Sequence, residues 1–243
     1  MECYDIKIDE TKIDDYNINN CIIDNINDIN SRFLLLEMNI SMMDLIYQSI
    51  KLQNQYKDIK LYTKSSFIDD NNKDYIYEKI NEILKDAKDD NIIIIKDFNE
   101  IHPYLSNLYN RNYQEIGNKK YAIIGSDKFE VNDQFKIIIL SDENYIRKCD
   151  IVFLKKFEKI NIQLKQLLNI KLMEYSNNLF EEIQIANSTK KYNVNINYSF
   201  KDIMINCSFE DIQGLVFYYY LWMKTNEDYD YDDIKQLSRD RSE

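Results

Sequence analysis

Four consecutive isoleucines, Ile92 to Ile95, constrain the fold of this 243-residue chain more than any other feature. β-branched residues favour strands, and a run without polar alternation is typical of a strand covered on both faces, as in a parallel sheet. Other candidate strands occupy residues 32–38, 59–62, 121–124 and 135–140. Apolar residues at helical spacing lie between them, within residues 41–50, 76–87 and 101–109. Because parallel strands need crossover connections, the sequence predicts an α/β fold, a mostly parallel sheet flanked by helices.

The pattern changes after about Ile160. Apolar residues between Ile160 and Ile183 predict one long amphipathic helix, and residues 209–224 predict a second. We therefore expect an irregular lead-in over residues 1–30, an α/β core over 31–159, an all-helical part over 160–225 and a charged tail over 226–243.

The chain is acidic, with 31 basic and 42 acidic side chains and a formal net charge of -11. Such a chain is repelled by phosphate backbones and by anionic lipid surfaces, so we expect no nucleic-acid partner. It contains no apolar run of the roughly 18 residues that a membrane span needs, so we expect no span. With no secretory signal pattern, we expect a cytoplasmic location.

Metal chemistry is disfavoured by the ligand inventory. A zinc site needs about four Cys or His side chains, usually in short paired spacings. The cysteines lie far apart, at Cys3, Cys21, Cys149 and Cys207, and His102 is the only histidine. We expect reduced thiols and no metal. His102 precedes Pro103 at a predicted helix start, where we expect it to cap the helix or to be exposed.

Nucleotide chemistry is limited by the lack of glycine. A phosphate-binding loop needs GxxxxGK[ST], because glycine lets successive backbone N–H groups point at the phosphates. The three glycines, Gly117, Gly125 and Gly214, do not fit that spacing or the GxGxxG dinucleotide fingerprint. We therefore expect no nucleotide cofactor, and no cofactor of any other kind.

Acidic residues follow two of the predicted strands. The isoleucine run leads into Lys96 and Asp97, which resembles the metal-binding strand of P-loop NTPases, with lysine in place of the first acid. Two interpretations remain open: a degraded ATPase strand, or a core strand that ends in solvated loop residues. We expect no catalytic residues; the weak candidates for a carboxylate site at the strand ends are Asp97, Glu100, Asp142 and Glu143.

The near-continuous apolar stretch from Phe217 to Met223 has two interpretations as well. It is a buried helix, which is the more frequent case, or an interaction face. Phe217 and Trp222 are its candidate contact residues.

Several motifs together resemble a known family. They are SSFIDD at residues 65–70, IIIIKDFNEI at 92–101, YLSNLYN at 104–110, KYAIIG at 120–125, FKIIIL at 135–140, FLKKFEK at 153–159 and YSFKDI at 198–203. In order and spacing they are similar to an AAA+ module of the mysterin family, giant AAA+ ATPases that carry a RING-type ubiquitin ligase region. The resemblance covers roughly residues 31–224 and implies an AAA+-like fold with a lid-like helical part.

The resemblance also implies roles for particular segments. Residues 135–140 are similar to the central strand that ends near the nucleotide in active AAA+ modules. Lys156 stands where an active ring offers an arginine to its neighbour's ATP, and lysine lacks the planar two-pronged contact of arginine. Lys156, Phe157 and Glu158 are therefore candidate contacts with a neighbouring module.

Three hypotheses follow from the sequence. The first is a non-catalytic, degenerate AAA+-like scaffold or interaction module, related to a ubiquitin ligase, whose partner is a protein or a neighbouring AAA+ module. The alternative is a small α/β enzyme with a carboxylate-lined cleft. The third, an ATPase that borrows a phosphate site from a partner, has least support.

Overall fold

The computed structural model describes residues 18–53, 57–65, 67, 72–125, 127–168, 170–189 and 208–225. The predicted tail over 226–243 and the motif at 198–203 lie outside these residues. The chain divides into two compact units, residues 1–40 with 54–162 and residues 41–53 with 163–243. We call them the α/β unit and the helical unit.

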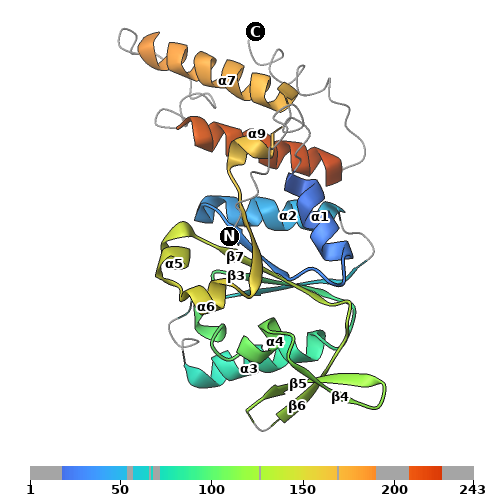
Figure 1. Cartoon of the computed structure of the whole chain (residues 1–243). Helices are drawn as coiled ribbons and strands as arrows, with labels where there is room; N and C mark the ends of the chain where they lie inside the picture. The colour runs from blue at the N-terminus through green and yellow to red at the C-terminus, as the bar shows by residue number, and fades with distance from the viewer. Residues whose placement is uncertain are drawn as a thin grey trace, which may run out of the picture. The chain divides into compact units, whose positions relative to one another are not determined.

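The α/β unit is built on a five-stranded parallel sheet (Figure 1). Its strands are β1 (Phe33–Glu37), β2 (Ile59–Thr63), β3 (Ile92–Lys96), β7 (Lys136–Ser141) and β8 (Phe157–Asn161), in the order β2-β3-β7-β1-β8. The strand β7 lies at the centre, which agrees with the position that the family resemblance gives to residues 135–140. The predicted α/β fold with a mostly parallel sheet is confirmed.

The isoleucine run is buried on both faces of the sheet. All four isoleucines of β3 are fully buried, and β3 pairs in parallel register with β2 on one side and β7 on the other. Ile93 and Ile95 belong to one core cluster together with Ile80 and Ile83 of α3 (Lys73–Asp86). Figure 1 shows α3 and the short α4 (Ser106–Tyr109) on the same side of the sheet. Burial of this apolar area is the main force that holds the unit together.

The segment over 18–27 was predicted to be irregular, and this prediction is wrong. It forms α1 (Ile18–Asn27), whose Ile18, Ile22 and Ile26 are buried. The spacing of four residues places these isoleucines on one helical face, and burial of that face offsets the weak helix propensity of the asparagines between them.

The segment over 121–124 is a strand, but it lies outside the parallel sheet. Strands β4 (Tyr113–Ile116), β5 (Lys119–Ile124) and β6 (Asp127–Val131) form a separate antiparallel sheet. Gly117, with φ of 62°, and Asn118 form the two-residue connection between β4 and β5. Two residues are too few for the crossover that parallel strands require, so these strands pair antiparallel.

The predicted helix over 160–183 is wrong in its first third. Residues 157–161 form strand β8, which pairs with β1 over its whole length. A 3-10 turn, η5 (Leu164–Gln166), follows, and helix α7 begins at Ile170. Pairing with β1 satisfies backbone groups of β1 that would otherwise stay unpaired, and this tertiary gain overrides the local helical spacing.

The remaining elements of the α/β unit are short. They are η4 (Asn99–Ile101), α5 (Glu143–Lys148) and α6 (Ile151–Leu154). The longer helix expected over 101–109 is reduced to η4, a turn and α4, since Pro103 has no backbone N–H to donate to a helical hydrogen bond.

The helical unit contains α2 (Met43–Gln53), α7 (Ile170–Thr189) and α9 (Phe209–Thr225), preceded by the turn η2 (Ile40–Met42) in the chain. The segment 41–53, which we expected in the core over 31–159, groups with the C-terminal helices. Helix α9 packs against both α2 and α7. A Cβ on Gly214 of α9 would lie 3.7 Å from Leu164 and 4.0 Å from Leu45, so these elements approach closely there.

Among the described helices, none combines the length and the apolar character that crossing a bilayer requires.

Candidate functional site

The carboxyl ends of β3 and β7 bring two predicted site residues together. Lys96 and Leu140 are partners in the register of the two strands, and the backbone N–H of Asp97 donates to the Leu140 carbonyl at 3.3 Å. Asp97 has a φ of 46°, a left-handed conformation that aspartate tolerates better than most residues. Asp142 follows β7 and caps α5, its carboxylate accepting from the Tyr145 N–H at 2.9 Å.

Three of the four candidate carboxylates interact at this edge. Removal from water raises the pKa of Asp97, and the negative charges of Asp142 and Glu100 raise it further. Removal from water also acts to raise the pKa of Glu100, but its hydrogen bond and ion pair with Lys64 lower it overall. The fourth candidate, Glu143, is exposed and forms an ion pair with Arg147 one turn along α5.

The chain after β1 has no glycine-rich loop. It runs through Met38 and Asn39 into the turn η2, and no glycine occurs in this connection. The backbone N–H of Met38 already donates to the Ser141 carbonyl at 3.1 Å. Among the described residues, no group of three or more His, Cys, Asp or Glu side chains is placed to hold a metal ion.

The candidate contacts around Lys156 lie at the opposite, amino-terminal end of β8. The Lys156 ammonium donates to the Ser106 hydroxyl at 2.6 Å. Phe157 is buried in the aromatic core, with its ring 5.0 Å from that of Tyr109. The Glu158 carboxylate accepts from the Arg32 backbone N–H at 3.0 Å. Lys156 and Glu158 are therefore the accessible members of this group.

The two candidates on α9 differ in exposure. Phe217 is only 2% exposed, whereas Trp222 is 42% exposed and stacks on Tyr219 at 5.5 Å between ring centroids. Helix α9 therefore has one buried face and one aromatic, solvent-exposed face. Each of the two interpretations from the sequence applies to one of these faces.

His102 was expected to cap the helix that starts there or to be exposed; it is buried, and it is the C-cap of the preceding turn η4, with its backbone N–H donating to the Asn99 carbonyl. It is 3% exposed, and its Nδ1 lies 2.8 Å from the Tyr109 hydroxyl. The rings of Tyr145 and Phe153 also pack around it. Burial lowers the pKa of His102 to about 4, so the ring is neutral at physiological pH.

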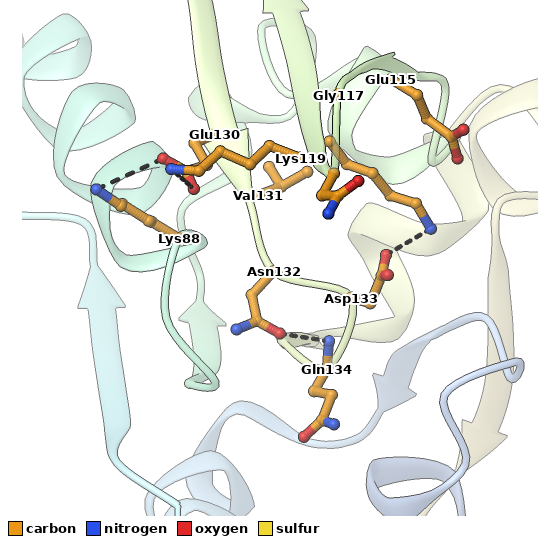
Figure 2. Close-up of a pocket in the computed structure, with 11 residues that line it drawn as sticks. Lys88, Glu115, Gly117, Lys119, Glu130, Val131, Asn132, Asp133 and Gln134 are labelled. Atoms are coloured by element: carbon orange, nitrogen blue, oxygen red, sulfur yellow. Dashed lines mark hydrogen bonds and ion pairs between the residues drawn. The ribbon is translucent and has the colours of Figure 1, made fainter.

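A polar hollow of about 500 Å³ lies beside the small antiparallel sheet (Figure 2). Its charged walls pair with one another: Lys119 with Glu130 at 2.6 Å, Lys88 with Glu130 at 3.6 Å and Lys120 with Asp133 at 2.8 Å. Because the charges are matched within the chain, the hollow offers little electrostatic gain to a charged ligand.

A second hollow, of about 470 Å³, was missed by the sequence reasoning. Its lining residues are Arg32, Ser106, Tyr109, Asn110, Arg111, Val152, Lys155 and Lys156. We call it the basic pocket. Four cations line it, although the chain as a whole is acidic. Only the adjacent pair Lys155 and Lys156 is visible as a charge cluster in the sequence, because folding assembles the pocket from three separate segments.

Comparison with known proteins places this geometry in a family. No curated protein matches the chain. A family model described as the RNF213 AAA domain matches residues 23–168, which is more than half of the chain. The match spans all five strands of the parallel sheet and agrees with the mysterin-type AAA+ module that the sequence motifs predicted. The chain belongs to the RNF213 AAA domain family.

Proposed function

We propose that this chain is a non-catalytic AAA-type module that serves as a scaffold or interaction unit beside neighbouring AAA modules or a protein partner in the cytoplasm. The observation that carries the proposal is the connection after β1, which lacks glycine and whose Met38 N–H is committed to Ser141. The connection lacks the glycines of a phosphate-binding loop and one of its donors is already used, which supports the absence of a cradle for the phosphates of ATP.

Two further departures support the loss of ATP chemistry. Lys96 ends β3 where a metal-holding carboxylate would be needed, and a lysine repels a divalent cation. Lys156 replaces the arginine that an active ring module offers to its neighbour, and an ammonium cannot make a bidentate contact with a phosphate. Each change alone would weaken ATP hydrolysis, and together they affect phosphate binding, metal binding and the contact with a neighbouring module's ATP.

The surface of α9 supports an interaction role. Tyr218 is 55% exposed, and Tyr219 and Trp222 are also exposed on the same helix. Aromatic side chains of this kind are enriched at protein interfaces because they bury a large area at low entropic cost. We propose Trp222 on this surface, together with Lys156 and Glu158 on the α/β unit, as contacts with the partner; Phe157 and Phe217 support them from the core.

The proposal is tested by binding of a hydrophobic dye to the isolated chain and by sedimentation. We expect clear dye fluorescence, reduced by Trp222→Ser. Phe67→Ser, which removes a 74% exposed aromatic ring from the α/β unit, is the matched control and should leave most of the signal. A monomer that binds no dye would contradict the interaction role.

A second candidate function, a small carboxylate enzyme, is favoured by one observation. Burial and the charges of Asp142 and Glu100 raise the pKa of Asp97, and raised carboxyl pKa values are frequent at general acids. Its test is a panel of simple ester, glycoside and phosphate ester substrates with the wild-type chain and with Asp97→Asn. Turnover that Asp97→Asn abolishes would support an enzyme; turnover that is absent, or equal in both proteins, would remove this candidate.

A further inference from the structure

The basic pocket brings together cations from three parts of the α/β unit. Arg32 precedes β1, Arg111 follows α4, and Lys155 and Lys156 separate α6 from β8. No aspartate or glutamate is among the eight lining residues. Like charges gathered in one hollow repel each other, so this arrangement costs stability unless an anion occupies it.

Arg111 is held in a fixed orientation within the pocket. Its Nη1 donates to the Ile29 carbonyl at 2.7 Å, and its guanidinium lies over the Phe33 ring, 4.7 Å from the centroid. Its backbone has a φ of 50°, a strained conformation for an arginine. These constraints position the guanidinium before any ligand arrives, which lowers the entropic cost of binding.

The second terminal nitrogen of Arg111 lacks a partner. Nη2 is buried, and no hydrogen-bond acceptor among the described residues reaches it. A buried donor that stays unpaired is uncommon in folded proteins and costs free energy. The charge of this guanidinium would attract an oxyanion in the pocket, while Nη2 itself stays shielded from solvent.

The positive charge of the pocket is not neutralised by carboxylates of the described chain. Arg32, Arg111, Lys155 and Lys156 form no ion pair with a described carboxylate. The carboxylate of Glu158 is engaged with the Arg32 backbone N–H and with the Asn25 side chain, at 3.0 and 2.6 Å. The charge of Arg111 also reaches the buried Lys136, whose pKa falls to about 8 through burial and, next, through Arg111, against the opposing charges of Asp28 and Glu158.

We propose that the basic pocket binds the phosphate group of a small phosphate monoester. Arginine matches phosphate oxygens in a planar, two-pronged contact, and the lysines add charge. The volume of about 470 Å³ lies within the range of small-molecule sites. Val152, 62% exposed at the same pocket, gives the organic part of a monoester an apolar contact. Such binding takes place within one chain and needs no neighbouring module, so it goes beyond the scaffold role.

The test is calorimetric titration of the full chain at low salt with phenyl phosphate, and separately with inorganic phosphate. We expect one site for phenyl phosphate, with affinity reduced about tenfold or more in Lys155→Gln/Lys156→Gln, because two charge-assisted contacts are lost. Lys128→Gln, which removes an exposed positive charge on β6 outside the pocket, should bind as the wild type does.

A second variant, Arg111→Lys, keeps the charge and removes the planar fork, so we expect it to weaken binding as well. If Arg111→Lys does not fold, the titration of Lys155→Gln/Lys156→Gln alone tests the proposal. Tighter binding of phenyl phosphate than of inorganic phosphate supports an organic monoester; equal affinities support free phosphate as the source of the same group. No binding of either probe, or binding unchanged in the lysine variant, would overturn the proposal.

Discussion

Lys96 is the register partner of Leu140 where β3 and β7 run side by side, and the next residue, Asp97, donates its backbone N–H to the Leu140 carbonyl at 3.3 Å. The carboxyl end of β3 is therefore fixed against the central strand with a lysine as its last residue. The nearby carboxylate of Glu100 is held by Lys64. Lysines of the chain itself lie among the carboxylates at this edge of the sheet, which supports the proposed loss of a metal and nucleotide site.

The first prediction concerns Asp97. Its folded pKa is raised by burial and by the charges of Asp142 and Glu100, so the ionised carboxylate costs more free energy in the native state than in the unfolded chain. We expect Asp97→Asn to stabilise the chain at pH 7 by about a few tenths of a kcal/mol, since the side chain is exposed and asparagine tolerates the positive φ. Thermal unfolding at several pH values checks this: the difference should shrink as the pH falls through the folded pKa. Asp24→Asn, at an exposed position of α1, is the control for the loss of one exposed carboxylate.

The second prediction concerns His102. Its folded pKa of about 4 lies below the unfolded value of about 6.5, so the unfolded chain binds a proton first. The stability from neutral His102 is complete above pH 6.5 and is lost as the pH falls toward 4, by about 3 kcal/mol in total. Urea unfolding between pH 7 and 4 measures the slope. His102→Phe should flatten the slope of stability against pH. It should also lower stability at pH 7, because the Tyr109 hydroxyl loses its partner. An unchanged slope would show that His102 is not the group responsible.

The third prediction concerns Lys136. Its buried ammonium donates to the Asp28 carbonyl at 2.5 Å and to the Ser31 hydroxyl at 2.8 Å, and its pKa is lowered to about 8. The unfolded chain therefore holds this proton up to about pH 10, so native stability should rise between pH 8 and 10. Relative to Lys136→Met, the wild type should gain about 2 kcal/mol over this range in urea unfolding. Lys159→Met, at an exposed position of β8, is the control for the same change of residue type at the surface.

The fourth prediction separates the two aromatic candidates on α9. Phe217→Ala removes a buried ring and should destabilise the helical unit by about 3–5 kcal/mol. Trp222→Ala removes an exposed ring and should cost about 1 kcal/mol or less while reducing partner contact. Trp222 is the only tryptophan, so its fluorescence reports unfolding of the helical unit in Phe217→Ala, and circular dichroism serves for Trp222→Ala. Equal losses in both variants would contradict the assignment of buried and exposed faces.

The sequence predicted the parallel sheet because its strongest strand signals are local. The isoleucines of β3 and the run in β7 are β-branched and buried on both faces, so propensity and tertiary environment agree there. At β8 the local propensity and the tertiary environment disagree. Phe157 and Ile160 continue the helical spacing of the residues that follow them, but pairing with β1 stabilises the strand more than the local preference stabilises a helix. The hairpin at Gly117 carried a recognisable turn signal, glycine followed by asparagine, that the strand assignment overlooked.

The candidate sites were less predictable than the fold. The acids at Asp97, Glu100 and Asp142 could be grouped because parallel strands end at one edge of a sheet. The basic pocket could not, since Arg32 and Arg111 are far apart in sequence and meet only after α4 packs near the start of β1. Burial of His102 depends likewise on rings from α5 and α6 that no local pattern brings to it.

The most direct test of the central claim, that this module has lost its ATP site, is calorimetric titration of the purified chain with MgATP. The account predicts no stoichiometric binding at the strand ends. Any weak heat from phosphate groups in the basic pocket should disappear in Lys155→Gln/Lys156→Gln. Clear one-to-one binding of MgATP that this variant retains would contradict the account and restore the ATPase interpretation.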